Sequence, residues 1–489
     1  MPVNAEPSPV PPLSSRTPPR LPNILWIMAD DLSWADLGCF GQKLIATPVL
    51  DRLTAEGMRF THCHSGNTVC APSRSSLMQG LHQGHASVRD NMRRFEEGKQ
   101  YRACLLPDDT TVAQLCRDAG YATGLFGKWG LALHDQPGLP NDKGFDEFFG
   151  YLNQRKAHSY YPSYLWHNKE RVDLPGNVGH DHTQPQEYDS DGRIRPYGVE
   201  DPSKAEYSFD LYHQKSLEFV KAHAGGPMFI YLAYTIPHGK HEAPELGQYK
   251  DEPWDDQHKA FAAMVTRMDT AIGELLEQMK KQGDLENTLV FFVSDNGYSF
   301  ARNDDSAPLN EVFNHRGPWK GGKGHLYQGG LRVPGLAWWP GKIKAGSESN
   351  QEWAFYDFLP TVADVIGAKP PEKCDGISIL PTLLGKPDEQ EQHGYFYWEY
   401  RDEQAVRIDG CWAHRENPSS PLRMYDAEND PGETNDLAAD KPDLVAKVQA
   451  IMAEAHVPTL QVPSPGETEE AWAERAAAAG FTLTHNVDT

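Results

Sequence analysis

The sequence contains no long apolar run and few cysteines. None of its hydrophobic stretches approaches the roughly eighteen residues that a membrane-spanning helix requires. Its seven cysteines, in 489 residues, lack the spacing of a disulfide framework, and an odd number does not suit complete pairing. These absences argue against a membrane protein and a disulfide-stapled one. We expect a cytoplasmic location, or a periplasmic one if an export signal has been trimmed.

Positive charge is also scarce. Lys and Arg total 46 against 69 Asp and Glu, which gives a net charge of −23. Such a surface repels the phosphates of nucleic acids and anionic membranes, so neither is expected as a partner. Residues 1–22 hold eight prolines and no apolar signal-peptide core, and we expect a disordered, proline-rich tail there.

Short apolar runs alternate with segments of helical periodicity, a pattern typical of a parallel sheet covered by helices on both faces. The runs are 24–29, 121–126, 228–234 and 289–293, and the helical segments include 47–57, 110–118 and 257–282. After residue 388 the pattern changes: two antiparallel strands are expected at 395–400 and 405–412, and a helix at 443–456. We predict an α/β fold, with a large, mostly parallel sheet sandwiched by helices over residues 23–388. A smaller C-terminal α+β subdomain with an antiparallel sheet is predicted over 389–489.

Polar, reactive residues follow four of the predicted strands. These are Asp30-Asp31, Gly127-Lys128-Trp129, Thr235 to His238, and Ser294 to Gly297. Open α/β sheets bind ligands beyond the carboxyl ends of their strands, so these residues should meet in one place. The aspartates and Asn296 offer hard oxygen ligands, which suit calcium or magnesium, although turn and cap roles are the alternative.

A zinc site is not expected. The candidates are His62, Cys63, His64, His82 and His85, and they match no known spacing of zinc ligands. We interpret them as core or surface residues.

The most distinctive local feature is Cys70-Ala71-Pro72-Ser73-Arg74. Pro72 and Ser73 are typical of a helix start, which would place Cys70 at a positive helix N-terminus with Arg74 one turn on. This position predicts a lowered thiol pKa and makes Cys70 a candidate nucleophile. The alternative is that Cys70 is a small, buried, apolar residue.

Cys-x-Pro-Ser-Arg resembles the activation motif of the type I, formylglycine-dependent sulfatases of the alkaline phosphatase superfamily. The resemblance runs from residue 23 to about 440, through motifs at 22–31, 127–129, 237–238, 295–297, 322–334 and 424–433. It implies an alkaline phosphatase-like fold and hydrolysis of sulfate esters, either aryl sulfates or sulfated carbohydrates.

The resemblance also implies a nucleophile and a metal. Cys70 would be oxidised to formylglycine by a maturation enzyme. One hydroxyl of the hydrated aldehyde would attack sulfur, and the other would then eliminate sulfate. Calcium, with magnesium as the alternative by ligand chemistry, would be held together with residue 70 by Asp30, Asp31, Asp295 and Asn296.

Four further residues match the family's catalytic positions. Arg74, Lys128 and Lys323 would surround the sulfate and stabilise its developing charge. His238 would protonate the leaving oxygen. Such a cluster of cations and a metal can hold an anionic sulfate within an otherwise acidic protein.

The sequence departs from the family at three positions. Gly130 stands where a catalytic histidine is usual, while Gln79 and Gln328 replace a common Thr and Glu. Either His158 or, less favoured, His134 could supply the missing imidazole, and otherwise no protein base does. The alternative role for His158 is a hydrogen bond to the alcohol part of the substrate.

Other interpretations stay open. A phosphomonoesterase or phosphodiesterase of the same superfamily is disfavoured by Cys70 and Asn296, since those enzymes generally use Ser or Thr as nucleophile and bind a second metal. A non-catalytic sulfate-binding homologue would explain Gly130 but not the retained Lys128, His238 and Lys323. The aromatic segment 157–162, with Trp166, predicts either a wall for a sugar ring or part of the core.

Overall fold

The computed structural model describes residues 20–94, 100–299 and 311–479. The predicted tail at 1–22 lies outside these ranges except for residues 20–22. No helix in the described part of the chain is long and apolar enough to cross a membrane.

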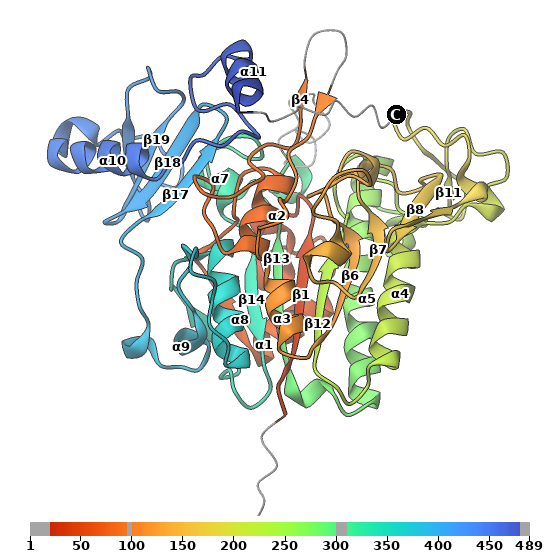
Figure 1. Cartoon of the computed structure of the whole chain (residues 1–489). Coiled ribbons are helices and arrows are strands. Elements are labelled where there is room, and N and C mark those ends of the chain that lie inside the picture. The colour runs from red at the N-terminus through yellow and green to blue at the C-terminus, as the bar shows by residue number, and fades with distance from the viewer. Residues whose placement is uncertain (1–19, 95–99, 300–310, 480–489) are drawn as a thin grey trace, which may run out of the picture.

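A ten-stranded sheet forms the centre of the molecule, and its five middle strands are parallel (Figure 1). In order across the sheet, the strands are β15 (Ser347–Ser349), β2 (Met58–Phe60), β14 (Gly335–Trp338), β13 (Thr288–Ser294), β1 (Asn23–Ala29), β12 (Met228–Ala233), β6 (Ala122–Lys128), β7 (Glu147–Tyr151), β8 (Tyr164–His167) and β9 (Glu170–Asp173). The register places Met28 of β1 beside Ala233 and Val293. The carboxyl ends of the middle strands therefore reach one edge of the sheet together.

Helices cover both faces of this sheet, as the continuous apolar runs predict. Successive residues of β1 point to opposite faces: Leu25 and Ile27 enter one core, and Ile24 and Trp26 enter the other. The first core is closed by α1 (Pro48–Glu56), α4 (Ser208–Ala222) and α5 (Asp256–Lys281). The second is closed by α2 (Cys70–Gln79), α3 (Val112–Asp118) and α8 (Phe358–Ile366). The predicted α/β sandwich is confirmed.

The C-terminal part contains a four-stranded antiparallel sheet, which is also as predicted. Its strands are β17 (Phe396–Tyr400), β18 (Glu403–Ile408), β19 (Cys411–Arg415) and β20 (Arg423–Asp426), and α10 (Pro442–Glu454) packs against it. The single strand predicted at 405–412 is wrong. The chain turns at Asp409 and Gly410, with φ values of +48° and +76°. An Asp-Gly pair adopts such angles readily and forms a tight hairpin.

Short elements complete the structure. They are β3 (Cys63–His64), β4 (Arg93–Arg94), β5 (Gln100–Tyr101), β10 (Glu187–Tyr188), β11 (Ile194–Arg195), β16 (Trp353–Ala354), α7 (Gln328–Leu331), α9 (Leu380–Leu383) and α11 (Glu469–Ala478).

Candidate active site

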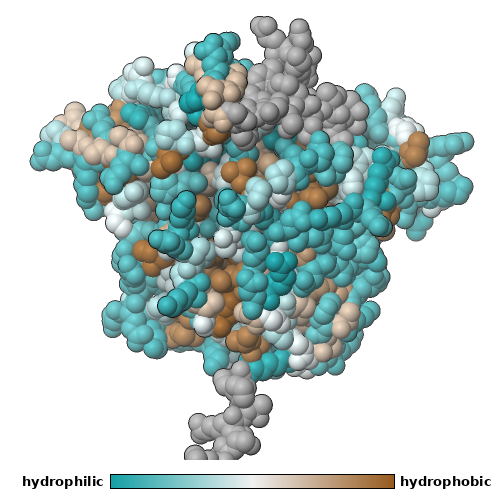
Figure 2. Space-filling model, in the orientation of Figure 1, coloured by the Kyte–Doolittle hydropathy of each residue, from teal (hydrophilic) through white to brown (hydrophobic). Residues whose placement is uncertain are grey.

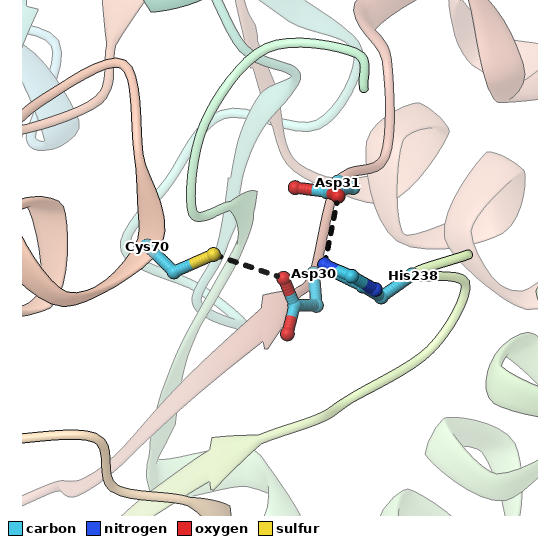
Figure 3. A group of neighbouring side chains, drawn as sticks. All are labelled: Asp30, Asp31, Cys70 and His238. Atoms are coloured by element: carbon cyan, nitrogen blue, oxygen red, sulfur yellow. Dashed lines mark hydrogen bonds and ion pairs between the residues drawn. The ribbon is translucent and has the colours of Figure 1, made fainter. Parts of the chain in front are cut away.

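The ends of four middle strands converge on one buried group of polar side chains, as the sequence predicts. Asp30 and Asp31 follow β1, Lys128 ends β6, His238 follows β12 and Asp295 follows β13. Lys128 Nζ lies 2.6 Å from Asp30 Oδ2, and His238 Nε2 lies 3.3 Å from Asp31 Oδ2. Figure 3 shows Asp30, Asp31, His238 and Cys70 facing one another. We call this group, with Arg74, Asn296 and Lys323, the strand-end cluster.

Cys70 begins α2, and its sulfur points into the strand-end cluster (Figure 3). Cys70 Sγ lies 3.5 Å from Asp30 Oδ1 and 3.3 Å from Lys323 Nζ. The predicted lowering of its pKa is wrong. Burial raises the pKa of the Cys70 thiol far above its usual range, and the carboxylates of Asp295 and Asp30 add to the effect. Lys128 and Lys323 oppose this rise without overcoming it. The unmodified thiol is therefore a poor nucleophile.

Two buried cations, Arg74 and Lys128, and the partly buried Lys323 balance the buried carboxylates. Arg74 Nη2 donates to Asp295 Oδ2 at 2.9 Å, and Arg74 Nη1 donates to the Lys128 carbonyl oxygen at 2.9 Å. Lys323 Nζ donates to both oxygens of Asp31, at 2.6 and 2.8 Å. Burial lowers the pKa of Lys323, but Asp31 and the neighbouring acids more than reverse this and hold it well above its usual value. Burial and the charge of Asp30 raise the pKa of Asp295. The opposite charges offset the free-energy cost of removing each group from water.

The ring of His238 has a defined orientation. Its Nδ1 donates to the Gly239 carbonyl oxygen at 2.5 Å, so Nε2 faces the cluster, where Lys323 Nζ lies 3.2 Å away. Burial and the charges of Lys323 and Lys128 lower the pKa of His238 well below its usual value. His158 stacks on this imidazole with the ring centroids 4.0 Å apart.

The structure separates the two histidines that could replace the one missing at Gly130. His158 lies against His238, whereas His134 is exposed and stacks on Trp166. Gly130 has a φ of +76°, and a Cβ there would lie 3.0 Å from Gln154 Oε1, so this backbone disfavours a side chain. Sequence reasoning did not single out Gln154.

The other two substitutions, Gln79 and Gln328, form structural hydrogen bonds. Gln79 Oε1 accepts from Ser75 Oγ at 2.8 Å and from the Ser87 N–H at 3.0 Å. Gln328 Oε1 accepts from Arg332 Nη1 at 3.3 Å.

Two further sequence features supply no side chain to the cluster. Tyr160 and Tyr161 are buried in the core, so they do not form a wall for a sugar. His82, His85 and Asp375 are close enough to hold a metal. The Gly84 N–H, however, points at His82 Nδ1 from 3.2 Å, which leaves the ring proton on the Nε2 that faces Asp375. This geometry makes His82 a hydrogen-bonding residue, and the expectation that these histidines do not bind zinc stays a prediction.

The donors of the strand-end cluster fit a hard divalent cation. Asn296 Nδ2 donates to Asp31 Oδ1 at 2.7 Å, while the buried Asn296 Oδ1 has no hydrogen-bond partner among the described residues. Ligand atoms of Asp30, Asp31, Cys70 and His238 lie within 4.8 Å of one another. Carboxylate and amide oxygens dominate, which suits calcium or magnesium.

Comparison with known proteins gives consistent matches. A family model described as Sulfatase matches residues 22–368, and one described as N-sulphoglucosamine sulphohydrolase, C-terminal, matches residues 322–457. The N-acetylgalactosamine-6-sulfatase of Homo sapiens is 32% identical over 375 residues, which cover 75% of this chain and 66% of that protein, just under two thirds. The steryl-sulfatase of Rattus norvegicus is 28% identical, with 90% and 89% covered.

Solved structures agree with the fold. Ps i-CgsB in complex with k-i-k-neocarrahexaose has a TM-score of 0.73 and 26% identity, and the match covers 94% of this chain and 98% of that one. The phosphonate monoester hydrolase of Agrobacterium radiobacter has a TM-score of 0.63 at 18% identity, with 89% and 95% covered, a likeness of fold alone.

Proposed function

The chain belongs to the sulfatase family of sulfuric ester hydrolases, and on this basis we propose that it hydrolyses sulfate esters to an alcohol and sulfate, with formylglycine at position 70. The observation that carries the proposal is the placement of Cys70. It begins α2 within the Cys-x-Pro-Ser-Arg motif, and its sulfur lies within 3.5 Å of Asp30 and Lys323. The raised pKa of the thiol explains why oxidation of the side chain would be needed.

The substrate we propose is a sulfated saccharide, with aryl sulfates as the alternative. Support comes from relatives whose names specify N-acetylgalactosamine-6-sulfatase activity and from a similar structure that holds a neocarrahexaose. Steryl-sulfatase and arylsulfatase D are also relatives, so the acceptance of aryl sulfates needs a direct assay.

The chain's own residues would divide the work. Arg74 and Lys128 are fully buried and fixed by ion pairs, so they can face a sulfate without reorganising. His238, with Nε2 toward the cluster, would carry the proton for the leaving oxygen. Lys323, which donates a hydrogen bond to that Nε2, would hold the ring in place.

A calcium ion would be held by Asp30, Asp31, Asp295 and Asn296 together with residue 70. When bound, it would act as a Lewis acid that offsets the charge of the sulfate oxygens. We expect chelation with EDTA to abolish turnover and lower the melting temperature, and calcium to restore both. Metal analysis should find one divalent ion per chain, whereas two zinc ions would favour the phosphoesterase alternative.

The decisive experiment reads residue 70 directly. The protein would be produced with a formylglycine-generating maturation enzyme, and the peptide spanning residue 70 analysed by mass spectrometry. We expect formylglycine in active protein and complete loss of 4-nitrophenyl sulfate hydrolysis in Cys70→Ala, with an unchanged melting temperature. Fully active protein that retains an intact thiol would contradict the mechanism. Hydrolysis of phosphate esters in preference to sulfate esters would contradict the substrate class.

A further inference from the structure

The backbone that carries His238 is held by a surface segment remote in sequence. Residues 178–199, which we call the excursion, lie between β9 and α4 and contact the stretch after His238. Lys240 Nζ donates to the Thr183 carbonyl oxygen at 2.6 Å, and the Ala243 N–H donates to Tyr188 Oη at 3.2 Å. The excursion supplies none of the residues of the strand-end cluster, yet it fixes the chain beside one of them.

A buried ion pair joins the excursion to this stretch. Glu242 is fully buried, and the side chain of His180 is 1% exposed. His180 Nε2 lies 3.2 Å from Glu242 Oε1 and 3.3 Å from Oε2. His180 Nδ1 lies 3.2 Å from the Tyr197 carbonyl oxygen, which can only accept, so Nδ1 carries a proton. A buried carboxylate without a partner is costly, so each group holds the other in place.

Tyr160 connects this pair to His238. Glu242 Oε2 accepts from the Tyr160 N–H at 3.3 Å. The buried Tyr160 hydroxyl lies 2.5 Å from the His238 carbonyl oxygen and 3.0 Å from that of Thr235. Two residues before Tyr160, the ring of His158 stacks on His238. One short segment thus contacts both the backbone and the ring of His238.

We propose that His180 is a positioning residue that keeps His238 aligned through Glu242 and Tyr160. Among the described residues, His180 forms no hydrogen bond or ion pair with the strand-end cluster, so its effect on catalysis is indirect. The kinetic consequence rests on the proposed sulfatase function. Alignment of a general acid matters most for a leaving group that needs protonation, because a stable phenoxide departs without it.

The kinetic test compares two leaving groups. For His180→Ala with formylglycine verified, we expect kcat for phenyl sulfate to fall about 10- to 100-fold and kcat for 4-nitrophenyl sulfate to fall less than about 3-fold, with KM little changed. His180→Gln keeps an N–H toward Glu242 and should restore most of the loss. The matched control is Glu187→Ala. Glu187 lies in the same excursion, is exposed, and forms no hydrogen bond or ion pair with Glu242 in the described structure, so both rates should stay unchanged.

Hydrogen–deuterium exchange supplies a readout independent of activity. We expect faster exchange over residues 235–243 in His180→Ala and in Tyr160→Phe, but not in Glu187→Ala. Equal losses for the two substrates, or unchanged exchange over 235–243, would overturn the proposal. If the wild-type protein hydrolyses no sulfate ester, the proposed function fails, while the exchange measurement still decides the role of His180. If His180→Ala does not fold, the kinetic comparison and the exchange measurement are made on His180→Gln and Tyr160→Phe.

Discussion

Residue 70 shows how burial decides the chemistry of a side chain. A helix N-terminus and nearby cations favour a thiolate, yet burial and two carboxylates outweigh them and raise the pKa of the Cys70 thiol. The motif therefore identified Cys70 as the candidate nucleophile but did not predict the direction of its pKa shift. An aldehyde does not depend on forming a thiolate, which is consistent with the proposed conversion to formylglycine.

The position of His158 beside His238 bears directly on the proposed sulfatase function. Its ring is part-exposed and stacks on the imidazole of His238. We expect His158→Ala to raise KM for a sulfated saccharide about 5- to 10-fold, because one hydrogen bond to the alcohol part is lost. The KM for 4-nitrophenyl sulfate should change little. Steady-state kinetics over a substrate panel make the comparison.

His134→Ala is the matched control, because this imidazole is exposed and stacks on Trp166 away from His238. An equal fall in kcat for every substrate, with an altered pH profile, would instead assign His158 the role of the missing base. Unchanged kinetics throughout would remove it from the site.

Among the elements, the contact between α7 and the segment after β20 depends on one buried acid. Glu433 Oε1 accepts from the Gln328 N–H that begins α7, at 2.9 Å. Burial raises the pKa of Glu433 from 4.5 to about 8, although this hydrogen bond and Lys320 oppose the rise. The folded state therefore binds the proton more tightly than the unfolded state. The resulting stabilisation is complete below pH 4.5 and is lost as the pH rises toward 8.

This loss of stability with rising pH predicts the behaviour of Glu433→Gln, which keeps a hydrogen-bond acceptor and cannot ionise. Its free energy of unfolding should be close to that of the wild type near pH 5 and exceed it by about 4 kcal/mol near pH 8.5. Urea unfolding at the two pH values measures the difference. The exposed Glu416→Gln serves as the control and should show no pH-dependent difference. A constant difference between variant and wild type would contradict the raised pKa.

At the level of the whole molecule, the C-terminal sheet forms hydrogen bonds with the segment that precedes α2. Trp398 Nε1 donates to the Ser65 carbonyl oxygen at 3.0 Å, and Asn67 Nδ2 donates to the Glu399 carbonyl oxygen at 2.8 Å. The buried Glu399 carboxylate also pairs with Arg89 at 3.0 Å and with His456 at 2.7 Å. The boundary near residue 388 stays a prediction, but these contacts join its two sides closely (Figure 1).

We expect Glu399→Ala to destabilise the protein by about 3–5 kcal/mol, because it leaves the buried Arg89 without its partner. Thermal unfolding should remain a single transition, since these hydrogen bonds and ion pairs join the C-terminal sheet to the large domain. Calorimetry tests both statements. Glu391→Ala, at an exposed position before the sheet, should change stability by less than about 0.5 kcal/mol. Two separate transitions in the wild type would contradict the shared unfolding.

The face of the molecule shown in Figure 2 is mostly hydrophilic, with apolar residues scattered singly or in small groups. This surface suits the net charge of −23. Because the chain repels anions overall, the proposed mechanism needs local cations to attract a sulfate. Arg74, Lys128 and Lys323, which lie in the strand-end cluster, would supply this attraction.

From the sequence alone, we predicted four parallel strands of the sheet, helices on its faces, the residues at the strand ends and the motif of Cys70. These follow from periodicity and from motifs within a few residues of one another, and local sequence contains that information. The turn at Asp409-Gly410 was also present in the sequence as a hairpin signal, but the apolar run around it suggested one strand. Three properties required the tertiary structure: the raised pKa of Cys70, the stacking of His158 on His238, and the path from His180 to His238. Burial and contacts between distant segments set these properties, and no stretch of the chain contains them alone.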